Sequence, residues 1–168
     1  VSEYIFEQLG GKGKVAHILG NEGSSAVNDR KQGFEDALAE YPDIEVVAEQ
    51  SAHWQRAEAL SLAEDWLTTY PDLNAIICQN DDMALGVVEA IESMGRTDVL
   101  VGGVNAIADA LAAVKAGRLD ATVYMDSHNV GVTALNLAVA AARGETVEKE
   151  TRLDMKIVNP ENIDEYLQ

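Results

Sequence analysis

The sequence contains little proline, cysteine or aromatic side chain. Its 168 residues include 3 prolines and 1 cysteine, and aromatic residues make up 5% of the chain. The low proline content excludes a collagenous or proline-rich chain, and a single cysteine excludes an internal disulfide. No apolar run approaches the roughly 18 residues that a membrane-spanning helix needs. With 47% hydrophobic residues, the chain can bury a sizeable core.

Positive charge is also scarce. Lysine and arginine total 12 residues against 29 aspartates and glutamates, which gives a formal net charge of −17. No basic stripe runs along the sequence, so we expect no nucleic-acid partner. An acidic excess of this kind is typical of a well-solvated surface, and it does not by itself identify a ligand.

Short apolar runs alternate with longer segments of helical periodicity along the whole sequence. The predicted strands are residues 15–19, 44–48, 75–78, 99–104, 121–124 and 153–158, and the predicted helices are 1–9, 26–40, 56–69, 82–94, 108–116 and 130–143. This alternation predicts an α/β fold of three layers, in which helices cover both faces of a doubly wound, mostly parallel sheet.

Two segments fit poorly in a single compact lobe. Residues 1–9 have the pattern of an amphipathic helix with no start signal before it, so we expect the chain to be cut within its first element. The segment 130–143 is almost wholly apolar or small, which predicts a helix buried on most sides. It is either a central helix of this domain or a helix whose packing partner lies in missing sequence.

Polar side chains follow five of the predicted strands. The segments concerned are 20–25, 50–54, 79–81, 105 and 125–128. Because the carboxyl ends of parallel strands share one edge of a sheet, we expect these segments to converge on one ligand. Their amides and carboxylates bond to hydroxyl groups, and the indole of Trp54 offers a flat apolar face. The pattern predicts a site for a small polyhydroxylated molecule.

Patterns typical of catalysis or metal binding are weak. The glycine-rich segment 10–14 precedes a strand and lacks the ending of a phosphate loop, and the three histidines show no metal-ligand spacing. Asp81 and Asp82 lie at a predicted helix start, where Asp81 serves as N-cap and Asp82 interacts favourably with the helix dipole. We therefore predict that the chain is not an enzyme and that it has no catalytic residue, metal or cofactor.

The segment Gln79-Asn80-Asp81-Asp82-Met83-Ala84-Leu85-Gly86, with Gly33-Phe34 and Ala121-Thr122-Val123, resembles the ribose- and galactose-type sugar-binding proteins of bacterial ABC transporters. The resemblance runs over about residues 1–160. It implies two α/β lobes that clamp a sugar by hinge closure. On this basis residues 1–125 form the second lobe, residues 126–146 form a crossover and an apolar helix that packs on the missing first lobe, and residues 147–168 return to the second lobe.

The resemblance also implies which residues contact the ligand. By position, the sugar contacts of the family fall on Trp54, Asn80, Asn105, Asn28 and Met125. Trp54 matches the stacking aromatic residue and Asn80 matches an amide. Asn28, Asn105 and Met125 replace the arginine, aspartate and glutamine of the ribose pattern. These replacements favour another sugar, a polyol or a cyclitol over ribose. Asn21, Gln50 and Asp126 are further candidates for the rim of the site.

The same resemblance implies a membrane permease as partner and a location that is periplasmic, or extracellular and lipid-anchored. Surface left exposed by the missing lobe would favour self-association. A sister family, the effector domains of LacI-type repressors, shares the fold and a similar Asn-Asp motif. Those repressors usually carry a Val-Pro-x-Asp turn that is absent here, where Arg96-Thr97-Asp98 leads directly to Val99. The transport protein is therefore the favoured interpretation.

Overall fold

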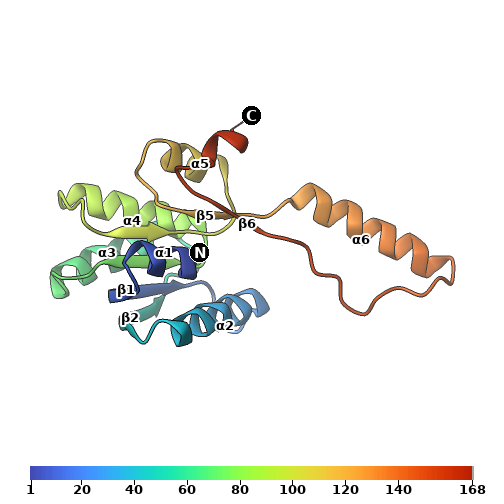
Figure 1. Ribbon diagram of the computed structural model, residues 1–168, viewed down its shortest axis with the longest axis horizontal. Coiled ribbons are helices and arrows are strands. Elements are labelled where there is room, and N and C mark those ends of the chain that lie inside the picture. Colours follow the sequence, from blue (N-terminus) through green and yellow to red (C-terminus); the bar gives the residue numbers. More distant parts are fainter. Residues whose placement is uncertain (168) are drawn as a thin grey trace.

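Four parallel strands form the centre of the protein. In the computed structural model, which describes residues 1–167, their spatial order is β2-β1-β3-β4 (Figure 1). The strands are β1 (Lys12–Leu19), β2 (Asp43–Ser51), β3 (Ala75–Cys78) and β4 (Leu100–Gly102). Two isolated parallel bridges, Gly102 to Ala121 and Asn105 to Tyr124, place β5 (Thr122–Tyr124) beside β4. The last strand, β6 (Lys156–Val158), pairs antiparallel with β5.

Helices cover both faces of this sheet. The side chains of each strand alternate between the two faces, so both faces carry apolar side chains that must be buried. On one face, Val15 of β1 and Ala75 of β3 pack with the helices α1 (Ser2–Gln8) and α2 (Ser25–Glu40). On the other face, Ala16 and Ile76 pack with α3 (Arg56–Thr69), α4 (Asp81–Ser93) and α5 (Ala108–Lys115). The two buried clusters give the three layers that the sequence predicts.

The predicted elements all occur in the described residues, and their ends differ from the prediction by at most three residues. The strand β3 and the helix α3 have the predicted bounds. A short 3₁₀ helix, η1 (Ile163–Glu165), follows β6 and was not predicted.

The helix α6 (Ser127–Ala142) projects away from the three-layer body, and residues 143–155 return alongside it (Figure 1). None of its residues is buried, and Leu135 is 65% exposed. Of the two alternatives for this apolar segment, the central helix of this domain is therefore wrong. Its packing on another lobe, and the domain boundaries drawn around it, stay predictions. No helix within residues 1–167 has both the length and the apolar character needed to cross a membrane.

Candidate functional site

The segments expected to converge follow neighbouring strands of the sheet. Trp54 follows β2, Gly20 follows β1, Asn80 follows β3, Asn105 follows β4 and Met125 follows β5. Because β1 to β5 run in the same direction, these residues lie along one edge. Adjacent strands are about 4.8 Å apart, so a side chain must lean along the edge to approach one that is two strands away.

The backbone at Trp54 has an uncommon conformation. His53 and Trp54 have φ angles of 50° and 65°, in the left-handed region that non-glycine residues seldom adopt. The indole then covers Gly20. A Cβ atom at Gly20 would lie 2.1 Å from both Cε2 and Cζ2 of the ring and 2.4 Å from Cδ2. Three ring atoms at such similar distances mean that the face of the indole covers Gly20, where only glycine fits.

Asn80 is the N-cap of α4, and this corrects the sequence-based assignment of that role to Asp81. The helix begins at Asp81, one residue earlier than predicted. The Asn80 side-chain oxygen therefore accepts a hydrogen bond from the Met83 amide at 2.9 Å. Asp82 is exposed and pairs with Arg56 at 2.9 Å. The side-chain oxygen of Asn80 is used in capping. Its side-chain nitrogen, Nδ2, could still donate a hydrogen bond to a ligand.

Asp81 is buried and holds the loop that follows β4. Its Oδ1 accepts a hydrogen bond from the Thr122 hydroxyl at 2.6 Å, and its Oδ2 accepts one from the Ile107 amide at 2.9 Å. The Thr122 hydroxyl oxygen in turn accepts a bond from the Ala106 amide at 3.2 Å. Burial raises the pKa of Asp81, and these hydrogen bonds oppose that shift.

This network fixes the backbone at Asn105. Asn105 and Ala106 have φ angles of 123° and 52°, so both occupy the left-handed side of the map. The Asn105 amide also donates to the Val123 carbonyl at 3.0 Å. Asn105 is half-buried, and its position depends on Asp81 and Thr122.

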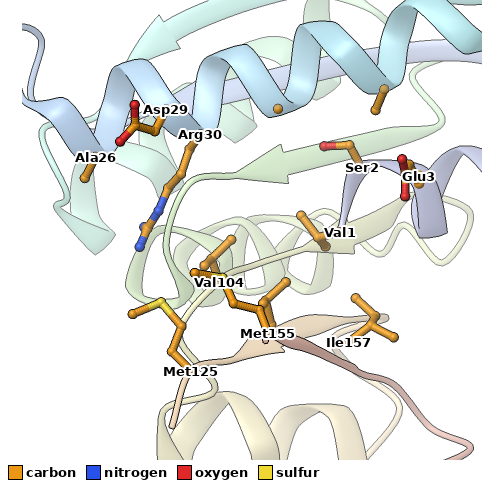
Figure 2. A pocket seen from close by; sticks show the side chains of 13 residues that line it. Val1, Ser2, Glu3, Ala26, Asp29, Arg30, Val104, Met125, Met155 and Ile157 are labelled. Atoms are coloured by element: carbon orange, nitrogen blue, oxygen red, sulfur yellow. The ribbon is translucent and has the colours of Figure 1, made fainter. Parts of the chain in front are cut away.

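A depression of about 660 Å³ opens between α2, the first turn of α1 and the ends of β4 to β6 (Figure 2). Its lining is mostly apolar and includes Met125, Met155, Val104, Val123 and Ile157. Arg30 of α2 and Met125 point towards one another across it (Figure 2). Of the five predicted ligand residues, Met125 is the one that lines this depression.

Arg30 is a residue of this edge that the sequence-based prediction missed. Its guanidinium Nη1 donates a hydrogen bond to the backbone carbonyl of Gln79, and its Cζ lies 5.6 Å from the centre of the Trp54 ring. Burial lowers the pKa of Arg30, while the charge of Asp81 opposes the shift. The available signal was an arginine soon after the loop that follows the first strand.

The other predicted positions lie further out. Asn28 is exposed near the start of α2 and is not part of the lining of the depression. Asn21 and Gln50 are also exposed. The Asp126 side chain caps α6 by accepting a hydrogen bond from the Asn129 amide at 2.9 Å.

The arrangement supports noncovalent binding of a small polar molecule. It offers amide groups, an indole, an apolar wall and one cation, which suit hydroxyl groups and C–H faces. Cys78 is fully buried, and burial raises the pKa of its thiol, so it presents no thiolate. Across residues 1–167, no group of three or more His, Cys, Asp or Glu side chains is placed to hold a metal ion.

Comparison with known families gives a match over most of the chain. A model described as a periplasmic binding protein domain matches residues 1–146. A xylitol-binding protein of Mycolicibacterium smegmatis is 35% identical over 163 residues, which are 96% of this chain and 47% of that protein. The chain spans about half the length of the curated relatives it matches.

Two solved structures share the fold and comparable sequence identity. An ABC transporter periplasmic solute binding protein of Actinobacillus succinogenes with bound D-allose has a TM-score of 0.93 and 34% identity, over 98% of this chain and 59% of that chain. An ABC transporter solute binding protein of Bacillus halodurans with bound myo-inositol has a TM-score of 0.89 and 37% identity, over 98% and 57%. The predicted fold class is confirmed by these matches.

Proposed function

Since the chain belongs to the family of periplasmic binding protein domains, we propose that it forms one wall of a site that holds a sugar, polyol or cyclitol for an ABC importer. The observation that carries the proposal is the shared sheet edge, where an indole, amides and an apolar wall follow neighbouring strands. The named ligands of the related proteins, xylitol, D-allose and myo-inositol, are all small polyhydroxylated molecules.

In this proposal each side chain of the edge has a defined role. Trp54 stacks on the C–H face of the solute, and Asn80 and Asn105 bond to its hydroxyl groups. Asn28 supplies a further hydrogen bond from α2. Met125 replaces a polar contact, which favours a solute with fewer hydroxyl groups on that side.

A second lobe completes the site. The solute is enclosed by hinge closure, with hinges near residues 125–128 and 144–150, and α6 packs against the other lobe. The closed form is delivered to a membrane permease, without chemical conversion of the solute. The matching location is the periplasm, or the outer surface of a cell with a lipid-anchored protein.

A thermal-shift screen tests the proposal. The two-lobe protein is heated with D-ribose, D-allose, xylitol and myo-inositol, each at a concentration well above its expected dissociation constant. A bound solute at one hundred times that constant stabilises the folded state by about 2.7 kcal/mol. The present chain alone should show little or no shift, because it supplies one wall. An equal shift for the chain alone contradicts the two-lobe account, and no shift with any polyol contradicts the proposed solute class.

Substitution of Trp54 tests the stacking wall in the same protein. Trp54→Ala should weaken solute binding at least tenfold, which is about 1.4 kcal/mol at 25 °C. Trp54→Phe keeps a flat face and should lose much less affinity. Isothermal titration calorimetry measures both. An unchanged dissociation constant for Trp54→Ala would remove this residue from the site.

A further inference from the structure

A short pair of strands connects α6 to the rest of the protein. β5 and β6 have three residues each, and the chain passes through them on its way to the projecting helix and back (Figure 1). β5 meets the main sheet through two isolated bridges rather than a continuous ladder. Because a two-stranded pair is marginally stable by itself, this one needs side-chain contacts to stay in place.

Residues 159–167, which we call the strap, follow β6 and begin with a reciprocal pair of asparagines. Oδ1 of Asn162 accepts a hydrogen bond from the Asn159 amide at 2.9 Å, and Oδ1 of Asn159 accepts one from the Asn162 amide at 3.3 Å. Nδ2 of Asn162 also donates to the Ile157 carbonyl of β6 at 2.9 Å. The start of the strap is therefore bonded to the strand from which it comes.

The strap also contacts β5 and α5. The ring centroid of Tyr166 lies 5.2 Å from that of Tyr124 in β5, with 54° between the ring planes. Ile163 of η1 is 2% exposed and belongs to the same buried cluster as residues of α5. Asp164 pairs with Lys115 of α5 at 2.5 Å, an exposed contact that contributes little. Through these contacts the strap joins both strands of the pair to a helix of the body (Figure 1).

The two ends of β5 are held by different groups. Thr122 at its start bonds to buried Asp81, whereas Tyr124 at its end meets Tyr166 of the strap. Met125 follows Tyr124 directly, and α6 begins shortly after it. The aromatic pair is thus the side-chain contact of β5 that lies nearest to the point where the chain leaves the body.

We propose that the strap is a conformational device that locks the β5–β6 pair to α5 and so holds the connection between the body and α6, with Tyr166 as its positioning residue. Its effect on ligand binding rests on the proposed function, in which a hinge lies near residues 125–128. Its effect on the strand pair depends on neither a ligand nor a second lobe. The strap can therefore be tested in the chain as it stands.

Hydrogen exchange of the ligand-free chain, followed by NMR, tests the strap. The measured quantity is the ratio of the exchange rates of the slowest amides of β5 and β6 to those of β1. Tyr166→Ala should raise this ratio at least tenfold, because the strand pair opens while the main sheet stays closed. Tyr166→Phe keeps the ring and should leave the ratio unchanged. The matched control is Tyr70→Ala, which removes another half-buried tyrosine packed against the same cluster and should not raise the ratio.

Asn162→Asp tests the bond of the strap to β6. It keeps an oxygen that accepts from the Asn159 amide and replaces the nitrogen that donates to the Ile157 carbonyl. The ratio should rise by at least threefold. Asn136→Asp adds the same charge at an exposed position of α6 and should leave the ratio unchanged.

An unchanged ratio in Tyr166→Ala would overturn the proposal, and so would an equal rise in Tyr70→Ala. Should Tyr166→Ala fail to fold, Asn162→Asp decides, and a ratio equal to that of the parent there overturns the proposal. Because no solute is added, a chain that binds no polyol would still pass or fail this test.

Discussion

Single buried polar side chains decide the local shape of the candidate site. Asp81, Gln79 and Thr122 are each at most 2% exposed, and each bonds to backbone groups of a different segment. A buried acceptor of this kind holds a loop because losing it would leave several donors without partners. Positions such as Asn105 are therefore set by residues that need not touch a ligand.

Asp81→Asn should destabilise the chain by about 2 kcal/mol, because the amide nitrogen of asparagine would replace one of two oxygens that accept hydrogen bonds. The neighbouring Asp82→Asn is the matched control. Asp82 is exposed and pairs with Arg56, so its loss should cost less than about 1 kcal/mol. Urea denaturation measures both. Equal costs would show that Asp81 does not hold the loop as described.

His17 makes the stability of the chain depend on pH. Its buried ring stacks on Phe34 at 4.1 Å between centroids and lies 3.1 Å from Glu49, which also pairs with Lys31. Burial lowers its pKa, and Glu49 partly offsets this. The unfolded state therefore binds the proton more readily than the folded state does.

The contribution of His17 is consequently complete above its unfolded pKa of about 6.5 and is lost as the pH falls through its lower folded pKa. Urea denaturation between pH 5 and 8 should show a stability that decreases towards the acid side. His17→Gln should reduce the slope in this window. If the stability of His17→Gln changed with pH as steeply as that of the parent, the pH dependence would come from other groups.

At the scale of elements, a glycine at the contact between two helices determines how closely they pack. Gly86 of α4 faces α3, where a Cβ atom would lie 2.3 Å from the backbone oxygen of Arg56. Gly33 of α2 has nothing within 4 Å of the same virtual atom. The first glycine permits close packing of two helices, whereas the second has no packing reason to be glycine.

Substitution of these two glycines by alanine should change the free energy of unfolding in opposite directions. Gly33→Ala should stabilise the chain by about 0.5 to 1 kcal/mol, because alanine loses less backbone entropy in a helix. Gly86→Ala should destabilise it by about 1 to 3 kcal/mol, because α3 and α4 must move apart. Chemical denaturation of both variants gives the comparison. Stabilisation by Gly86→Ala would contradict the close approach of the two helices.

At the scale of the molecule, the three-layer body contrasts with α6. The body buries one apolar cluster on each side of the sheet, whereas α6 projects away from it (Figure 1). Val132, Leu135 and Val139 are 43%, 65% and 40% exposed. Their spacing places them on one side of the helix. An apolar surface of this kind is typical of a contact with another protein or lobe.

The chain by itself should therefore associate through α6. Light scattering at increasing concentration should give a mass above that of the 18.1 kDa monomer. Leu135→Lys with Val139→Glu should reduce the association without a net change of charge. Asn136→Lys, a change at an exposed polar position of the same helix, should leave it unchanged. A monomer at all concentrations would contradict this prediction.

Much of the fold was predictable because it depends on local patterns. Short apolar runs predicted the strands, and the helix α3 and the strand β3 have their predicted bounds. The candidate site was predictable as an edge of the sheet but not in its details. A shift of one residue in the start of α4 moved the N-cap from Asp81 to Asn80. The position of Arg30 early in α2 was a weak signal, and its partners Gln79 and Trp54 are distant in sequence.

The sequence alone determined the order of strands and helices, the parallel sheet and the polar character of its carboxyl edge, because hydrophobic periodicity and turn residues act over short distances. The tertiary structure alone decided that Asp81 is buried beneath the Asn105 loop, that Trp54 covers Gly20 and that α6 stands outside the body. These features depend on side chains brought together from separate segments, and only packing in three dimensions sets which of them meet.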